Sequence, residues 1–406
     1  MKAPSRPLSS AEFIALLAFM VSIVAMASDV MLPALAIIGA DLGISDANNT
    51  QLIVSSLFLG LAIGQFFSGA LSDSFGRRTV ILWGYAIFLV GCLLSIFATD
   101  LTIMLLGRVL QGLGAAAPRD VGVSIVRDRY EGRAMARVMS VIMSIFILVP
   151  ALAPGIGQGV LYVLPWPYTF VVLLLMGATA ALWFGLRQPG TLAAENRRRF
   201  SLPNMLASYR QLLRIRAVLG YIIVMGFIFG PFIAYLGMAR QIFQDTLGVG
   251  ELFAVYFGIA SLAIGAASVC NSLLVMRLGM RLLCRIALYA NVGLSGVFLW
   301  IFWREGGVPP IQLFLIWQLS VFFCMGILFG NLNALAMEPL GKMAGLGAAL
   351  IGFISSIMSL PIAWLIGQLY DGTVLSLVGG FFVLGVCALI AAWWTERSSP
   401  SATRTS

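Results

Sequence analysis

The sequence contains no histidine and very little charge. Without histidine there is no imidazole to ligate a metal, to activate a serine or cysteine nucleophile, or to relay protons. Asp, Glu, Lys and Arg make up 10% of the 406 residues, against about 25% in a soluble domain. No cluster of Asp, Glu or Cys replaces the missing imidazoles. We therefore expect no soluble fold, no metal site, no cofactor and no enzyme active site.

Cysteine is also scarce. The five cysteines are odd in number and scattered, which is typical of small buried side chains and not of disulfides. No G-x-x-x-x-G-K-[ST] loop is present, so ATP-driven transport is disfavoured. The net charge is +9, but the arginines lie in short segments between apolar runs. Nucleic acid is therefore not an expected partner.

Apolar sequence is what the chain has in abundance, at 60% hydrophobic residues. A helix of about 20 apolar residues crosses a bilayer and satisfies its own backbone hydrogen bonds there. We predict an all-α integral membrane protein, with the lipid bilayer as its surroundings. The twelve predicted transmembrane helices cover 12–38, 50–71, 79–98, 101–123, 135–160, 166–186, 217–239, 251–275, 282–303, 311–336, 345–369 and 374–395.

Lys and Arg predict the orientation. With the N-terminus in the cytoplasm, only Arg240 and Arg304 fall clearly outside, as the excess of basic residues in cytoplasmic loops requires. A multi-pass protein of the cytoplasmic (inner) membrane follows, with both termini in the cytoplasm. The longest polar segment separates two sets of six helices. The predicted parts are an N-terminal half 1–186, a basic linker 187–216, a C-terminal half 217–396 and a tail 397–406.

The turn after the second segment contains the pattern G-x-x-x-D-x-x-G-R-R, formed by Gly69, Asp73, Gly76, Arg77 and Arg78. Gly69 permits close approach of another helix, and Gly76 frees the turn dihedrals. Asp73 is placed to accept hydrogen bonds from the arginines or from a helix N-terminus. An ordinary basic loop is the alternative. The pattern resembles the signature loop of the major facilitator superfamily, in which a basic residue usually stands where this chain has Ser74.

Asp29 is a rare acid inside an apolar segment. It lies about nine residues before the outer end of the first helix, or ~13 Å deep. A charge costs roughly 2.5–3.5 kcal/mol in such a place, so it marks a functional site. Ser22 shares its helix face, and Pro33 removes the N–H that would bond to the Asp29 carbonyl, which predicts a kink. We expect a site for a proton or a substrate cation; a permanent pair with an arginine is the alternative.

Arg108 lies at a similar depth in the fourth segment, ~10 Å from its outer end. With Gln111 and Gly112 it forms the pattern R-x-x-Q-G, which resembles the fourth-helix motif of the major facilitator superfamily. In that family the arginine is associated with proton coupling, and the resemblance implies this role here. Helix packing through Gly112 and Gly114 is the alternative.

Arg119 and Asp120 lie near the cytoplasmic mouth of the same segment. Arg119 is about three helical turns after Arg108, so the two share a face. Two interpretations stay open. Arg119 and Asp120 form a gate pair, or Arg119 extends its side chain towards the lipid headgroups.

The fifth segment contains Pro150, Pro154, Gly155 and Gly157. Prolines kink a membrane helix, and glycines let neighbouring helices approach. The segment resembles the proline-glycine motif of exporters within the superfamily, although the family favours Gly-Pro and a terminal Gly-Gly over the Ala-Pro-Gly and Gly-Gln found here. A generic kinked helix is the alternative.

The segment from Ser28 to Pro33 is also similar to the first helix of the Bcr/CflA-like branch, which confers bicyclomycin and chloramphenicol resistance. Further similarities at 127–130 and 337–339 extend the resemblance over the whole chain. It implies a monomer in two six-helix halves that alternates access and exports small amphipathic compounds, phenicol- or bicyclomycin-like antibiotics among them, in exchange for protons. An exporter or facilitator of an endogenous metabolite is the alternative.

Overall fold

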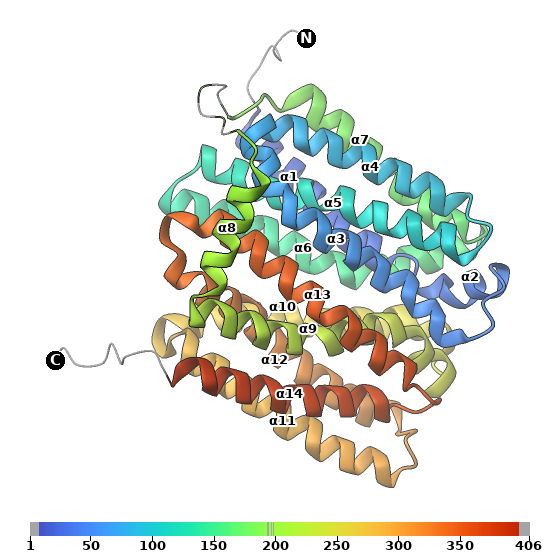
Figure 1. Ribbon diagram of the computed structural model, residues 1–406. Coiled ribbons are helices and arrows are strands. Elements are labelled where there is room, and N and C mark those ends of the chain that lie inside the picture. Colours follow the sequence, from blue (N-terminus) through green and yellow to red (C-terminus); the bar gives the residue numbers. More distant parts are fainter. Residues whose placement is uncertain (1–7, 193–194, 196, 198, 398–406) are drawn as a thin grey trace. The chain divides into compact units, whose positions relative to one another are not determined.

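The computed structural model describes residues 8–192, 195, 197 and 199–397. Arg198 of the predicted linker and most of the predicted tail, 398–406, lie outside the described residues. The regular elements of the described ranges are all helical (Figure 1). Their α-helices are α1 Ser10–Asp29, α2 Leu35–Asp41, α3 Gln51–Phe75, α4 Arg77–Ile96, α5 Leu101–Arg129, α6 Gly132–Leu161, α7 Pro167–Arg187, α8 Leu202–Leu213, α9 Arg216–Arg240, α10 Phe253–Leu278, α11 Met280–Arg304, α12 Ile311–Met337, α13 Ala344–Gln368 and α14 Leu375–Glu396.

Twelve helical stretches of the described chain are long and apolar enough to cross a membrane, which confirms the predicted number. The first, Ser10–Asp41, is interrupted and contains both α1 and α2. The seventh continues beyond α9 into a π turn, Gln241–Thr246. Several stretches extend past their predicted ends. The short helix α8, within the predicted linker, was not expected.

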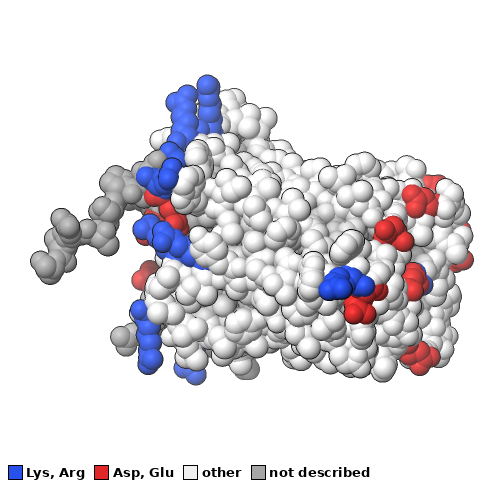
Figure 2. All heavy atoms as spheres, turned by 90° about the horizontal axis from the view of Figure 1, so that it is seen from below, with Lys and Arg blue, Asp and Glu red and all other residues white. Residues whose placement is uncertain are grey.

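Charge is distributed along the helices as the sequence predicts. On the face shown in Figure 2, Lys and Arg lie mainly at one end, an uncharged band follows, and a group of Asp and Glu lies at the other end. Such an uncharged band is what a hydrocarbon core requires. The side of the membrane on which the termini lie stays a prediction.

The chain forms two compact units. Unit 1 comprises Met1–Ser201 and Leu236–Leu262, and unit 2 comprises Leu202–Tyr235 and Ala263–Ser406. The boundaries between the units thus fall inside α9 and α10 as well as before α8, whereas the predicted halves meet at the linker.

In unit 1, α3 and α5 pack with their backbones in contact. A Cβ added at Gly112 of α5 would overlap the Leu57 carbonyl of α3, and one added at Gly60 would overlap the Val109 carbonyl. Only glycine fits this crossing, as predicted for Gly112. The close approach brings Arg108, on the adjoining turn of α5, against the backbone of α3.

The end of α9, the start of α10 and the turns between them belong to unit 1 and are attached to it by polar contacts. Gln51 Nε2 donates to Gln241 Oε1 at 2.9 Å, and Gln241 Nε2 donates to Asn48 Oδ1 at 3.2 Å. Gln158 Nε2 donates to the Glu251 carbonyl at 3.0 Å. These amides attach 236–262 to α3, to the 3₁₀ turn Ala47–Thr50 before it, and to α6.

In unit 2, aromatic and amide side chains join α12 to its neighbours. Phe322 of α12 makes an edge contact with Tyr235 of α9, with ring centroids 4.8 Å apart. Asn331 of α12 and Asn271 of α10 exchange hydrogen bonds of 2.6 and 3.3 Å. Each amide thereby satisfies the other inside the membrane region.

Candidate functional site

Asp29 lies at a break in the first span. α1 ends at Asp29, a 3₁₀ turn Leu32–Ala34 contains Pro33, and α2 begins at Leu35. The predicted kink is therefore an interruption, because proline cannot donate to the Asp29 carbonyl. The side chain is buried at 3% exposure, and its Oδ1 accepts a hydrogen bond from Ser28 Oγ at 2.6 Å. Ser22 instead bonds to the Ala18 carbonyl of its own helix.

Arg108 is fully buried, and the groups around it come from several helices. Its Nε donates to the Ile53 carbonyl of α3 at 3.0 Å, and its Nη2 donates to the Ala27 carbonyl of α1 at 2.8 Å. Its guanidinium also lies 5.8 Å from the ring centre of Phe170 in α7. Arg108 thus joins α1, α3 and α5 at the level of the α1 break.

Gln111 completes this arrangement. Its Oε1 accepts from Arg108 Nη1 at 2.6 Å, and its Nε2 donates to Ser95 Oγ at 3.0 Å and to the Gly91 carbonyl at 3.3 Å. The R and Q of the R-x-x-Q-G pattern are therefore in direct contact. Arg108 and Gln111 are three residues apart, and side chains at this spacing are neighbours on one helix face.

No ion pair joins Asp29 to Arg108 in the described part of the chain. The alternative of an acid paired permanently with an arginine does not hold in this structure. The arginine is satisfied by carbonyl and amide oxygens, whereas the carboxylate has one hydroxyl donor. Arg108 bonds to the Ala27 carbonyl, two residues before Asp29, so two buried ionisable groups lie near each other without pairing, which marks a candidate functional site.

Helix α6 contacts the same break. A Cβ added at Gly157 would overlap the Val30 carbonyl, directly after Asp29. Pro150 and Pro154 lie within the continuous α6. A Cβ added at Gly155 would meet open space. The expectation of close helix approach therefore holds for Gly157 and was wrong for Gly155.

Arg119 and Asp120 lie apart from this site. Both are partly buried, and Asp120 Oδ2 accepts a hydrogen bond from Ser68 Oγ at 3.4 Å. The structure shows no ion pair between Arg119 and Asp120, and the suggested gate pair stays a prediction. Because adjacent side chains on a helix point about 100° apart, neighbouring positions such as these do not face each other.

The signature loop lies between α3 and α4. Gly76 has φ +89°, a conformation that favours glycine, as predicted. Arg77 pairs with Asp128 of α5, and Arg78 donates to the Gly185 carbonyl of α7. The prediction of close helix approach at Gly69 was wrong for this structure, because nothing lies near the position of its Cβ. A gate role for Asp73, in the last turn of α3, stays a prediction.

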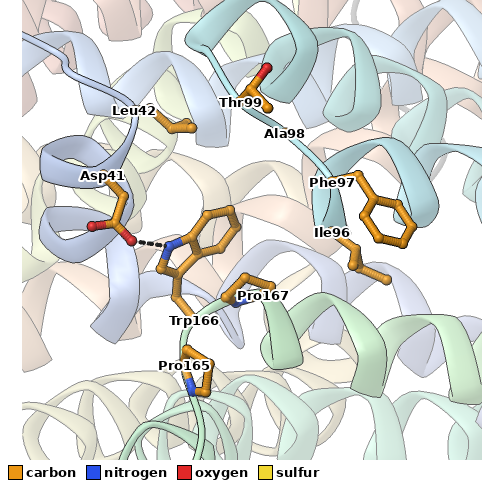
Figure 3. Close-up of a pocket in the computed structure, with 9 residues that line it drawn as sticks. All are labelled: Asp41, Leu42, Ile96, Phe97, Ala98, Thr99, Pro165, Trp166 and Pro167. Carbon is orange, nitrogen blue, oxygen red and sulfur yellow. Dashed lines mark hydrogen bonds between the residues drawn. The ribbon is translucent and has the colours of Figure 1, made fainter.

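A surface depression of about 550 Å³ lies in unit 1, between the end of α2 and the loops that precede α5 and α7 (Figure 3). Trp166 Nε1 donates to Asp41 Oδ2 at 2.6 Å in its wall. The Trp166 ring makes an edge contact with Phe170, at 6.1 Å between centroids, and Phe170 faces Arg108. The end of α2 is thus linked to the arginine through two aromatic rings.

Sequence reasoning missed several of these groups. Ser28 was detectable, since it is adjacent to Asp29. Ser95 and Phe170 were not, because they come from α4 and α7, and no pattern in the sequence links those positions to Arg108.

Comparison with known proteins places these features in a family. The family model "Major Facilitator Superfamily" matches residues 17–363. The chain is 30% identical to the "Uncharacterized MFS-type transporter YdgK" of Bacillus subtilis (strain 168), over 89% of this chain and 90% of the relative. It is 28% identical to the "Bicyclomycin resistance protein homolog" of Haemophilus influenzae, with the same coverage. It is 26% identical to "Multidrug resistance protein D" of Escherichia coli (strain K12), over 91% and 93%.

Solved structures agree on the fold. A D-xylose-proton symporter superposes with a TM-score of 0.80 at 13% identity, over 97% of this chain and 98% of the other. At that identity the similarity concerns the fold alone. The resemblance to the Bcr/CflA-like branch is confirmed by the drug-resistance relatives. The chain belongs to the major facilitator superfamily and is a multi-pass membrane transporter, not an enzyme.

Proposed function

We propose that this transporter is a drug/proton antiporter that exports small amphipathic compounds, such as phenicol- or bicyclomycin-like antibiotics, by alternating access. The observation that carries the proposal is Asp29, a carboxyl group buried at 3% exposure in a membrane span and held by one hydroxyl donor. A carboxyl group in such a place serves as a proton carrier when its exposure to water changes during the cycle.

Arg108 supplies the second element of the proposed coupling. Its guanidinium bonds to the Ala27 carbonyl, two residues before Asp29. A shift of α1 along α5 changes the distance from this positive charge to the carboxyl group. An approaching guanidinium favours release of the proton, and its withdrawal favours uptake. Movement of one helix is thereby coupled to proton binding.

The proposed substrate class and direction rest on relatives. The printed names of two relatives refer to bicyclomycin resistance and multidrug resistance. An amphipathic substrate also suits a chain whose membrane-spanning helices carry few charges, because a strongly charged solute needs several compensating side chains.

The test is substrate flux in proteoliposomes with and without an imposed pH gradient. In wild-type protein the gradient should drive accumulation of substrate. Asp29→Asn preserves the shape but cannot change charge. It should abolish accumulation driven by the gradient while substrate binding remains. An Asn variant that still concentrates substrate in response to the gradient excludes Asp29 as the proton carrier, and Asp120 becomes the next candidate.

A compound panel separates drug export from the alternative, an exporter or facilitator of an endogenous metabolite. Expression in a drug-hypersensitive host should lower accumulation of phenicol-like compounds, and a protonophore should restore it. Lowered accumulation that persists with the protonophore contradicts proton coupling. No effect on any drug favours the metabolite alternative.

A further inference from the structure

Helix α8 is an α-helix of unit 2 that is too short to span a bilayer. Its 12 residues, Leu202–Leu213, extend about 18 Å, against about 30 Å of hydrocarbon. Figure 1 shows α8 running across the direction of α13 and of α9, whose residues up to Tyr235 belong to unit 2 together with α13. If those two cross the membrane, the axis of α8 lies along the membrane plane.

The side chains of α8 are arranged in stripes. Met205, Tyr209 and Leu212 are buried on the face that packs on unit 2. Beside them, Leu202 and Leu206 are 42% and 48% exposed. At about 100° per residue, these two leucines lie next to the buried stripe.

Arginines follow the leucines around the helix. Arg210 lies about 40° beyond Leu206, and Arg214, just after the helix, continues the same rotation. Both are exposed. Neutral Asn204 and Gln211 occupy the remaining side. Around the helix, an apolar face is thus followed by a basic face and then by a neutral polar face. This arrangement is typical of a helix lying in a membrane interface.

Tyr209 keeps the buried stripe uncharged. Burial raises the pKa of its hydroxyl to about 12, so the group stays protonated at neutral pH. The positive charges of α8 therefore act only on its exposed side.

The chain segment that contains α8 carries charge of one sign. From 196 to 216 the sequence has no acidic residue and contains six arginines. Among them, Arg197 and Arg199 precede α8 and are exposed. An exposed segment with an excess of positive charge attracts anions, and the anions of a membrane surface are lipid headgroups.

Contacts at the start of α9 place α8 at the depth of the headgroups. Arg216 donates to the Trp394 carbonyl, and its guanidinium lies 4.2 Å from the centre of the Trp394 ring. Trp393 and Trp394 are 56% and 42% exposed at the end of α14, where tryptophans mark the membrane–water interface. Only residues 214 and 215 separate α8 from Arg216, so the C-terminal end of α8 lies within about 10 Å of that level.

We propose that α8 binds anionic lipid of the cytoplasmic leaflet, with Leu202 and Leu206 among the upper acyl chains and Arg210 and Arg214 on the headgroups. The proposal uses the membrane location of the chain and not its proton coupling or substrate. A measurement that does not involve transport therefore tests it separately from the proposed function.

The experiment is hydrogen exchange of the α8 amides in the full chain, in nanodiscs of phosphatidylcholine alone or mixed with phosphatidylglycerol. Each arginine near an anionic surface strengthens association about fivefold. Exchange of the α8 amides should be slower with phosphatidylglycerol, and high salt should reduce the difference. Arg210→Gln combined with Arg214→Gln should remove it.

Two further variants make the result specific. Arg277→Gln removes an exposed arginine from the end of α10 and should leave the phosphatidylglycerol effect on α8 intact. Leu202→Ser with Leu206→Ser should increase exchange in both lipid mixtures. Equal exchange of wild-type α8 with and without phosphatidylglycerol overturns the proposal and leaves this surface to a protein partner. A lipid effect that survives loss of both arginines also overturns it.

Discussion

At the residue scale, the surroundings of Arg108 explain why the site needs an arginine. A fully buried cation is stable only if each polar direction around it is satisfied. Here the guanidinium donates to two backbone carbonyls and to the Gln111 side-chain oxygen, and it lies near the Phe170 ring. The planar guanidinium directs its donors to several helices at once.

Replacing Arg108 with lysine tests this geometry. A lysine ammonium keeps the charge but cannot reach Ile53, Ala27 and Gln111 from one fixed fork. Loss of one charge-assisted hydrogen bond costs about 1.5–3 kcal/mol, so Arg108→Lys should lower initial transport rates at least about tenfold. Rates are measured in proteoliposomes with equal amounts of folded protein.

Arg304→Lys is the control for that experiment. Arg304 is exposed at the end of α11, and the substitution should leave transport unchanged. Wild-type rates in Arg108→Lys would mean that positive charge or packing alone is the role of the residue.

At the element scale, the first span consists of two helices held separately. α1 ends at Asp29, and α2 is attached at its far end by the Trp166–Asp41 hydrogen bond. The break is covered by α6, which meets Val30 at Gly157. Such a break lets α2 move without α1.

Gly157 and Gly155 form a matched pair for testing this packing. Gly157→Ala places a methyl group against the Val30 carbonyl, and overpacking of this kind costs about 1–3 kcal/mol. It should lower the thermal unfolding temperature in detergent and impair transport. Gly155→Ala meets open space and should do neither. Equal behaviour of the two variants would contradict the close contact between α6 and α1.

The amide contacts of α3 with the π turn give a second prediction at this scale. π turns are rare and frequently occur at functional sites. Gln51→Ala and Gln241→Ala should each destabilise the protein by about 1 kcal/mol, because each removes the hydrogen bond between the two buried amides. A double-mutant cycle of unfolding free energies should show coupling. Strict additivity would mean that the hydrogen bond does not hold segment 236–262.

At the scale of the whole molecule, the proposed alternating access predicts that the signature loop changes partners during the cycle. In this structure Gly76 has a positive φ, and Arg77 and Arg78 are bound to α5 and α7. If Asp73 acts in the inner gate, its charge affects the rate of the conformational change more than the affinity for substrate.

Asp73→Asn should therefore lower the turnover number while KM stays close to the wild-type value. Asp245→Asn, at the other end of the helices, serves as the control, because its carboxylate is exposed and pairs with the nearby Arg240. Initial rates over a range of substrate concentrations separate the two parameters. A raised KM with unchanged turnover would argue for a role of Asp73 in binding substrate.

The sequence by itself determined the features that depend on local chemistry. Spans follow from length and hydropathy, because lipid leaves the backbone no other partner. The break after Asp29 follows from Pro33, which lacks a donor, and the contact of Arg108 with Gln111 follows from their spacing on one helix.

Only the tertiary structure decided which groups surround each of these residues. Glycines 69, 155 and 157 look alike in the sequence, yet only Gly157 touches a neighbouring backbone. Likewise, Arg108 bonds to carbonyls of Ala27 and Ile53 and not to Asp29. The reason is physical: contacts between helices depend on which faces meet and at what height, and every residue offers the same backbone carbonyl, so the sequence does not mark the ones that are used.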